Sequence, residues 1–90
     1  MKAIFKYSLD VVDSALIRAP SGAKPLCVQV QKGKPFIWME VNPQNVMEDH
    51  YFRVVGTGNK VPDEYFGEYL GTFQQFDGDF VGHVYWEESK

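Results

Sequence analysis

The chain has 90 residues, of which 44% are hydrophobic and 23% charged, and its formal net charge is −3 at pH 7. A chain of this length has room for one hydrophobic core, so we expect a single domain over residues 1–90. The mild acidity argues against a generally basic surface, and nucleic acid is therefore not an expected partner.

The aromatic content of 16% favours β-structure, because aromatic side chains suit a pleated, half-buried surface. Turn residues punctuate the chain at short intervals, as in a small sandwich or barrel. In chain order we expect strands at 2–9, 15–18, 26–31, 36–41, 51–55, 69–76 and 79–87, with a brief helical turn near 46–49. The predicted fold is all-β: a compact antiparallel β-sandwich or open barrel of six to seven strands, with at most one short helix.

Alternation assigns faces to the early strands. In the first strand, Ala3, Phe5, Tyr7 and Leu9 share one face, and in the third, Leu26, Val28 and Val30 point inward. Five lysines lie in or near these strands: Lys2, Lys6, Lys24, Lys32 and Lys34. We interpret them as solvated side chains at strand edges in preference to a basic patch.

Residues 35–41 are apolar on both faces of the predicted strand. If the preceding turn is Lys32-Gly33, Val28 faces Ile37, and Phe36 and Trp38 lie on the outer face. A three-residue loop would exchange the two sets. The outward face is covered by other parts of the chain, or it is a homo-oligomer or partner surface.

The end of the chain contains the firmest hairpin, because Asp77-Gly78 is typical of a type I′ turn. The resulting register pairs Phe73 with Gly82, Gly71 with Val84 and Tyr69 with Trp86. One face is then core: Tyr69, Phe73, Phe80, Val84 and Trp86. The other face is polar and is either a solvated sheet face or a ligand surface: Leu70, Thr72, Gln74, His83 and Tyr85.

Arg53 shares a strand face with Tyr51, Val55 and Thr57. Two interpretations stay open for it. The guanidinium pairs with Glu40 or Glu68, or it holds a phosphate, a carboxylate or an acidic partner through its planar fork of donors.

Catalysis has little support in the sequence. His50 and His83 stand in neither metal nor triad spacing, and Cys27 is expected to be a packing residue. Gly56-Thr57-Gly58 lacks the third glycine and the lysine of phosphate-binding loops, so a strand end with a bulge is favoured. We therefore expect no enzyme activity, no cofactor and no metal. A lone cysteine, with no leader and no long apolar run, leads us to expect a cytoplasmic protein without a membrane partner.

The chain resembles a family of short bacteriophage and prophage proteins of unknown function. The resemblance covers nearly the whole chain, through 1–7, 17–24, 27–31, 52–58, 69–74 and 80–85. In that family a histidine often follows Gly-Thr-Gly, whereas Asn59 stands here, which lowers the expectation of catalysis further.

The resemblance implies a phage origin and no particular chemistry. Because many short phage proteins act by binding, we expect a non-enzymatic, phage-encoded accessory protein that binds and blocks or sequesters a host component, acting against bacterial defence. In one version it is a homo-oligomeric sponge for a nucleotide signal. Arg53 meets a phosphate, Trp38 or Tyr85 stacks on a base, and hydrogen bonds come from Thr72, Gln74 and His83. In the other it inhibits a host protein through Phe36, Trp38 and the acidic Asp63-Glu64 loop. The alternative is a virion-associated β-domain that assembles through strand edges.

Overall fold

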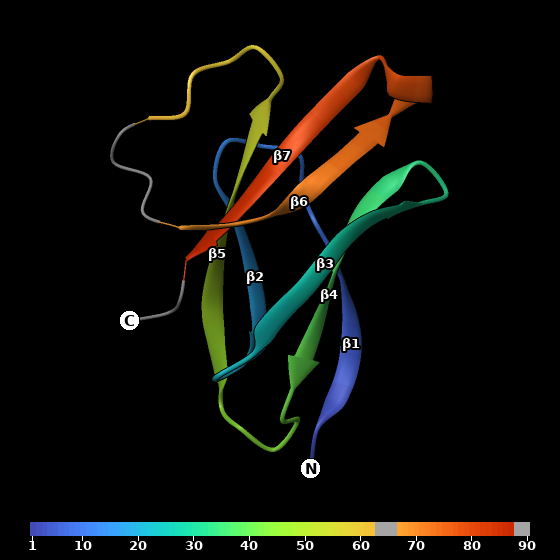
Figure 1. The fold of residues 1–90 in the computed structure, drawn as a ribbon. Helices are drawn as coiled ribbons and strands as arrows, with labels where there is room; N and C mark the ends of the chain where they lie inside the picture. The colour runs from blue at the N-terminus through green and yellow to red at the C-terminus, as the bar shows by residue number, and fades with distance from the viewer. Residues whose placement is uncertain (63–66, 88–90) are drawn as a thin grey trace.

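The computed structural model describes residues 1–62 and 67–87, which form two antiparallel sheets packed as a β-sandwich (Figure 1). The three-stranded sheet has the order β1-β4-β3 and the four-stranded sheet the order β2-β5-β7-β6. The seven strands are β1 (Ala3–Ser8), β2 (Ala15–Pro20), β3 (Lys24–Gln31), β4 (Lys34–Val41), β5 (Met47–Gly56), β6 (Glu68–Gln75) and β7 (Phe80–Glu87). The all-β sandwich predicted from the sequence is confirmed.

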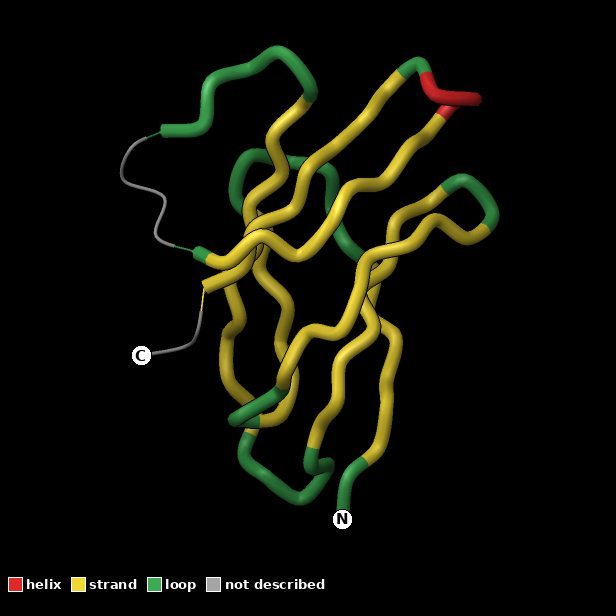
Figure 2. Tube along the Cα trace, in the orientation of Figure 1, coloured by secondary structure: helices red, strands yellow, loops and turns green. Residues whose placement is uncertain are grey.

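Helical structure within the described ranges is limited to the 3₁₀ turn Phe76–Gly78 (Figure 2). The helical turn predicted near 46–49 is wrong. β5 begins at Met47, and its first residues pair with the end of β2, as Pro20 with Met47 and Ala19 with Glu48. Backbone pairing across the sheet prevails there over the local preference of the segment.

The core lies between the two sheets and is filled by alternate residues of the strands, the largest fully buried ones being Ile37, Met39, Val41, Phe52 and Val84. The inner face predicted for β1 packs here through Ala3, Tyr7 and Leu9, while Phe5 stays 43% exposed at the edge of its sheet.

The inward position predicted for Leu26 is wrong. The register of β3 shifts between Pro25 and Cys27, so Pro25 is buried and Leu26 is left exposed. Such a bulge places one extra residue in a strand and turns its side chain out of the alternation. Val28, beyond the bulge, is buried as expected.

The β3–β4 turn is Lys32-Gly33, with φ angles of 51° and 80° at these two residues. A two-residue turn with positive φ at both positions matches the twist of a hairpin. It pairs Val28 with Ile37, as the first of the two sequence alternatives requires. Phe36 and Trp38 therefore lie on the outer face of the three-stranded sheet.

The β6–β7 hairpin turns at Asp77-Gly78, where φ is 55° and 91° and the Asp79 amide donates to the Phe76 carbonyl at 3.0 Å. The predicted left-handed turn is confirmed, although β6 ends one residue earlier than expected, at Gln75, and β7 begins one residue later, at Phe80.

Most of the predicted hairpin register is also confirmed, since Phe73 pairs with Gly82 and Gly71 with Val84. The predicted pairing of Tyr69 with Trp86 is wrong. A register shift between Tyr69 and Gly71 places Tyr69 opposite Tyr85 instead. Leu70, expected on the outer face, packs against the core, and Tyr69, expected in the core, is 51% exposed.

β3 and β6 lie side by side and join the two sheets along one side of the sandwich (Figure 1). Gly71 makes this approach possible, because a Cβ there would lie 3.1 Å from Val28 Cγ1. The side-chain amide of Gln75 donates through its Nε2 to the Gly33 carbonyl at 2.9 Å across the same seam. Gly71 is therefore a packing position, as its predicted core-facing register indicated.

Candidate binding site on the outer face of the four-stranded sheet

The five residues predicted as ligand contacts lie on one surface, the outer face of the four-stranded sheet. Arg53 on β5 pairs with Tyr85 on β7, and Thr72 on β6 pairs with His83 on β7. Gln74 follows two residues after Thr72 and is exposed. The strand neighbours of these residues point into the sandwich and are buried: Phe52, Val54, Phe73 and Val84. Strand alternation thus separates a core face from a polar face.

His83 is held between three hydroxyl groups. Its Nε2 hydrogen-bonds with Thr57 Oγ1 at 2.7 Å, and its Nδ1 with Thr72 Oγ1 at 3.0 Å and Tyr69 OH at 3.1 Å. The hydroxyls of Tyr69 and Thr72 also hydrogen-bond to each other. In a neutral imidazole one nitrogen donates and the other accepts, so at least one of the three hydroxyls donates to the ring. We call Thr57, Tyr69, Thr72 and His83 the hydroxyl–imidazole cluster.

Thr57 enters this cluster because of the turn that ends β5. The Asn59 amide donates to the Gly56 carbonyl at 3.0 Å, and Gly58 has a φ of 91°, a conformation that glycine adopts readily. The Thr57 amide and hydroxyl donate to the Val81 carbonyl at 3.1 and 3.4 Å. The Gly-Thr-Gly run therefore ends a strand and positions one hydroxyl beside His83.

Sequence reasoning does not identify Thr57 and Tyr69 as members of this site. The bulge at Leu70 moves Tyr69 to the outer face, and hairpin registers do not predict that β5 lies next to β7. The hairpin register links Thr72 with His83, and the one sequence pattern that includes Thr57 is the repeated Gly-Thr pair, Gly56-Thr57 and Gly71-Thr72.

An aromatic and charged flank continues the polar face. The rings of Tyr69 and Tyr85 meet edge to face, with centroids 5.2 Å apart. Arg53 is half-buried, and its Nε lies 3.7 Å from Glu87 Oε1. Glu40, one of the partners predicted for Arg53, instead pairs with Lys2 on the other sheet at 3.3 Å. Guanidinium, phenol rings and hydroxyls are thus neighbours on one surface.

The predicted partner surface lies on the other side of the sandwich. Phe36 and Trp38 are half-buried on the outer face of the three-stranded sheet, with ring centroids 6.2 Å apart. Trp38 therefore cannot stack on a ligand held by Arg53, which removes one of the two stacking partners expected from the sequence. Tyr85, directly opposite Arg53, remains. The acidic pair Asp63-Glu64 lies outside the described residues.

The two other residues with reactive side chains, His50 and Cys27, lie within the packed sheets. His50 is 3% exposed, and its Nε2 lies 3.3 Å from the Ala19 carbonyl and 3.2 Å from the Pro20 carbonyl. Cys27 is half-buried opposite Trp38. Across residues 1–62 and 67–87, no group of three or more His, Cys, Asp or Glu side chains is arranged to hold a metal ion. The same residues contain no helix long and apolar enough to cross a membrane.

A family model described as a domain of unknown function, DUF7352, matches residues 1–90. No curated protein and no solved structure matches the chain.

Proposed function

Since the chain belongs to the DUF7352 family, whose description assigns no activity, we propose its function from geometry: a non-enzymatic binding protein that sequesters a nucleotide-like ligand. The ligand occupies the outer face of the four-stranded sheet, between Arg53 and the hydroxyl–imidazole cluster.

The observation that carries this proposal is the prearranged state of the cluster. Thr57 and Thr72 are exposed, yet their hydroxyls converge on opposite nitrogens of the same ring. Ordered side chains lose less conformational entropy on binding than freely rotating ones, so each hydrogen bond to a ligand contributes more to affinity. Hydroxyls and imidazole both donate and accept, which suits the mixed edge of a base or sugar.

Arg53 and Tyr85 supply the other two contacts that a nucleotide needs. A guanidinium binds phosphate oxygens through paired, charge-assisted hydrogen bonds, and a tyrosine ring offers a stacking surface. The ion pair of Arg53 with Glu87 is long, at 3.7 Å, and about one third of each side chain is solvent-exposed. A phosphate therefore competes with a weak, partly solvated contact.

The resemblance to phage and prophage proteins supports a biological role for such capture. Many short phage proteins act by binding, and removal of a nucleotide signal is one way to block host defence. The protein is accordingly proposed to act in the host cytoplasm, without a cofactor.

The experiment is thermal melting and calorimetric titration against cyclic dinucleotides and ADP-ribose-type nucleotides. A ligand at 100 times its Kd stabilises a protein by about 2.7 kcal/mol. Arg53→Ala should weaken binding by about 10- to 100-fold, as expected for a hydrogen bond to a charged group worth about 1.5–3 kcal/mol. Thr72→Val, which removes only a hydroxyl, should give a smaller loss.

Arg18→Ala is the matched control. Arg18 lies on the edge strand β2 of the same sheet and, like Arg53, is paired with a carboxylate, that of Asp49 on β5 at 2.8 Å. This variant should bind like the parent protein. The proposal fails if no nucleotide shifts the melting temperature, or if Arg53→Ala and Thr72→Val both bind normally. Thr57 and His83 also lie at hydrogen-bond distance, as a nucleophile and its base do. The bound ligand should therefore be recovered after incubation and checked for chemical change. A chemically altered ligand would overturn the non-enzymatic assignment.

A second candidate is assembly through a strand edge, as in a virion-associated domain. β1 lies at the edge of its sheet and carries Ile4 and Phe5, which are 61% and 43% exposed. An apolar edge strand can pair with a second copy. Light scattering tests this: a concentration-dependent oligomer that dissociates in Ile4→Lys supports it, and a monomer at all concentrations refutes it.

A further inference from the structure

Positive charge is concentrated on one side of this acidic protein. Five lysines lie in or next to the strands of the three-stranded sheet or in the β3–β4 turn: Lys2, Lys6, Lys24, Lys32 and Lys34. Glu40 is the one acidic residue in β1, β3 and β4, and it pairs with Lys2 at 3.3 Å. The net charge of −3 hides this segregation, because the remaining acidic residues lie elsewhere in the sequence. We call this outer surface the basic face.

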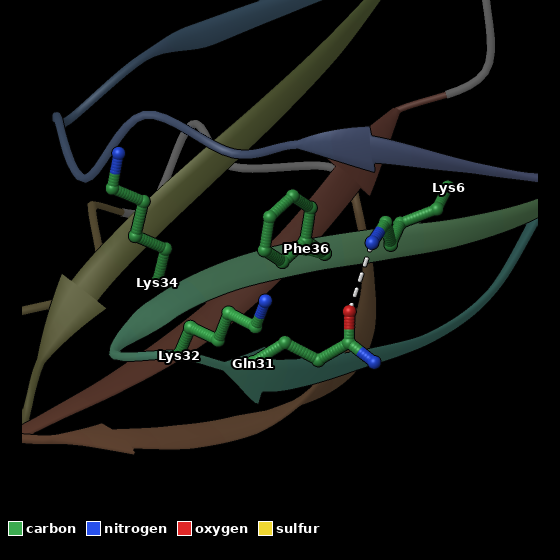
Figure 3. A pocket seen from close by; sticks show the side chains of 5 residues that line it. All are labelled: Lys6, Gln31, Lys32, Lys34 and Phe36. Atoms are coloured by element: carbon green, nitrogen blue, oxygen red, sulfur yellow. Dashed lines mark hydrogen bonds between the residues drawn. The ribbon is translucent and has the colours of Figure 1, made fainter.

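An aromatic side chain lies among three of these lysines, Lys6, Lys32 and Lys34. Phe36 lines a hollow of ≈ 540 Å³ together with Gln31, Lys6, Lys32 and Lys34 (Figure 3). The Lys6 ammonium lies 4.6 Å from the centroid of the Phe36 ring and donates to Gln31 Oε1 at 2.9 Å. Trp38 follows two residues later on the same face, with its ring against Phe36. The two rings therefore follow one another along β4.

We propose that the basic face binds single-stranded nucleic acid along β4, with bases against Phe36 and Trp38 and phosphates on the flanking lysines. A basic groove with successive aromatic side chains is the arrangement that non-specific single-strand binding uses. In a duplex the base faces are stacked on each other and closed to aromatic side chains, so an unpaired strand is required. Outward residues of a β-strand are about 6.6 Å apart, roughly twice the rise between stacked bases, which again requires an unstacked strand.

The extent of the basic face favours a polymer over a free nucleotide. The hollow is lined by Lys6, Lys32 and Lys34. Lys24 lies outside it, opposite Glu40 in the strand register near the far end of β4. β4 has eight residues, which corresponds to a length of about 26 Å. A free nucleotide reaches only the hollow, whereas a strand of several nucleotides spans the whole row. Lys6 covers the Phe36 ring in the free protein, and this exposed cation–π contact is weaker than base stacking, so a base can replace it.

This site is independent of the proposed function, because it lies on the opposite side of the sandwich from Arg53 and His83. The experiment measures fluorescence anisotropy of labelled 12-mers of oligo-dT and oligo-rU with the whole protein at several salt concentrations. Affinity should fall with salt, with a slope of log K against log salt of about −0.7 per neutralised phosphate.

The charge test is the double variant Lys32→Glu with Lys34→Glu, which alters the turn and the start of β4 but no core residue. It should lower affinity at least about 10-fold at low salt. Lys60→Glu is the matched control, since Lys60 is exposed and lies outside the basic face; it should bind like the parent protein. Phe36→Leu should lower affinity by about 5- to 100-fold while its circular dichroism stays unchanged, which isolates stacking from charge.

The proposal is overturned by an unchanged anisotropy with both oligonucleotides at low salt. It is equally overturned if the double lysine variant binds as tightly as Lys60→Glu. Equal affinity for duplex DNA, or normal binding by Phe36→Leu, would reduce the site to a simple polyanion surface and refute the single-strand assignment. If a mononucleotide displaces the labelled oligonucleotide as well as unlabelled oligonucleotide does at the same phosphate concentration, the preference for a polymer is refuted.

Discussion

Gly82 on β7 is the position where one added methyl group tests the packing beneath the candidate site. A Cβ at Gly82 would lie 2.5 Å from Phe73 Cζ, 2.7 Å from Phe73 Cε1 and 3.1 Å from Phe80 Cε2. Carbon atoms prefer separations of about 3.5–4.0 Å, so the Phe73 ring has to move by roughly 1 Å. Phe73 is 3% exposed and packs against Phe80 with ring centroids 6.0 Å apart, which leaves the ring little room.

Gly82→Ala should therefore destabilise the protein. Overpacking of a core costs about 1–3 kcal/mol, and the reduced entropy of the unfolded chain returns about 0.4–1 kcal/mol. The expected net loss is about 1–2 kcal/mol. For a domain of this size that lowers the melting temperature by about 4–16 °C. Urea unfolding followed by circular dichroism measures the free energy of unfolding directly.

Phe73→Leu provides the decisive second arm, because leucine lacks the ring atoms that the new methyl group would contact. Alone it should destabilise by about 1–2 kcal/mol, less than the loss for a full truncation to alanine. In that background Gly82→Ala should cost little, so the double-mutant cycle should give a coupling energy of about 1–2 kcal/mol. An equal cost of Gly82→Ala in both backgrounds, or stabilisation in the parent protein, would refute the contact and with it the register that pairs Thr72 with His83.

Two further predictions concern buried polar groups. His50→Leu removes the imidazole donor of the Ala19 and Pro20 carbonyls, of which Pro20 also accepts from the Ala23 amide at 3.1 Å, and should cost about 1–3 kcal/mol in urea unfolding. His50→Gln keeps an N–H group and should cost less, and equal losses would contradict the hydrogen bonds. Burial raises the pKa of the Tyr7 hydroxyl above its ordinary value of 10.0. The neutral phenol is therefore favoured in the folded state, and its contribution to stability is complete below pH 10.0 and is lost as the pH rises through the folded pKa. Tyr7→Phe should lose less stability than the parent protein in this alkaline range, and an identical pH profile for both would contradict the shift.

Local sequence predicts the hairpins of this protein well. Asp77-Gly78 adopts the left-handed conformation expected of it, and Lys32-Gly33 forms the two-residue turn of the first sequence alternative. These two turns set the pairings of β6 with β7 and of β3 with β4. Because side chains alternate along a strand, parity then places Arg53, Thr72 and His83 on outward positions. Turn chemistry and alternation are properties of a few neighbouring residues, and they can therefore be recognised without the rest of the chain.

The bulges depend on contacts between distant segments. In β6, Gly71 packs against Val28 of the other sheet, and beside it Leu70 turns inward and Tyr69 outward. The strict alternation assumed from the sequence misassigns both residues. Leu26 in β3 is misassigned for the same reason. No short-range pattern specifies where a strand must adapt its register to a neighbouring sheet.

The sequence by itself determined the β-class, the Asp77-Gly78 hairpin and the alternation that places Thr72 and His83 on one face, because these follow from local conformational preference. The tertiary structure alone decided which strands became neighbours. It brought β5 beside β7, so that Thr57 reached His83, and it separated Trp38 from Arg53 onto opposite sheets. It also gathered Lys6, from β1, with the lysines of the β3–β4 hairpin around Phe36. Strand order results from the joint burial of apolar faces along the entire chain, so surfaces built from several strands emerge only in the folded protein.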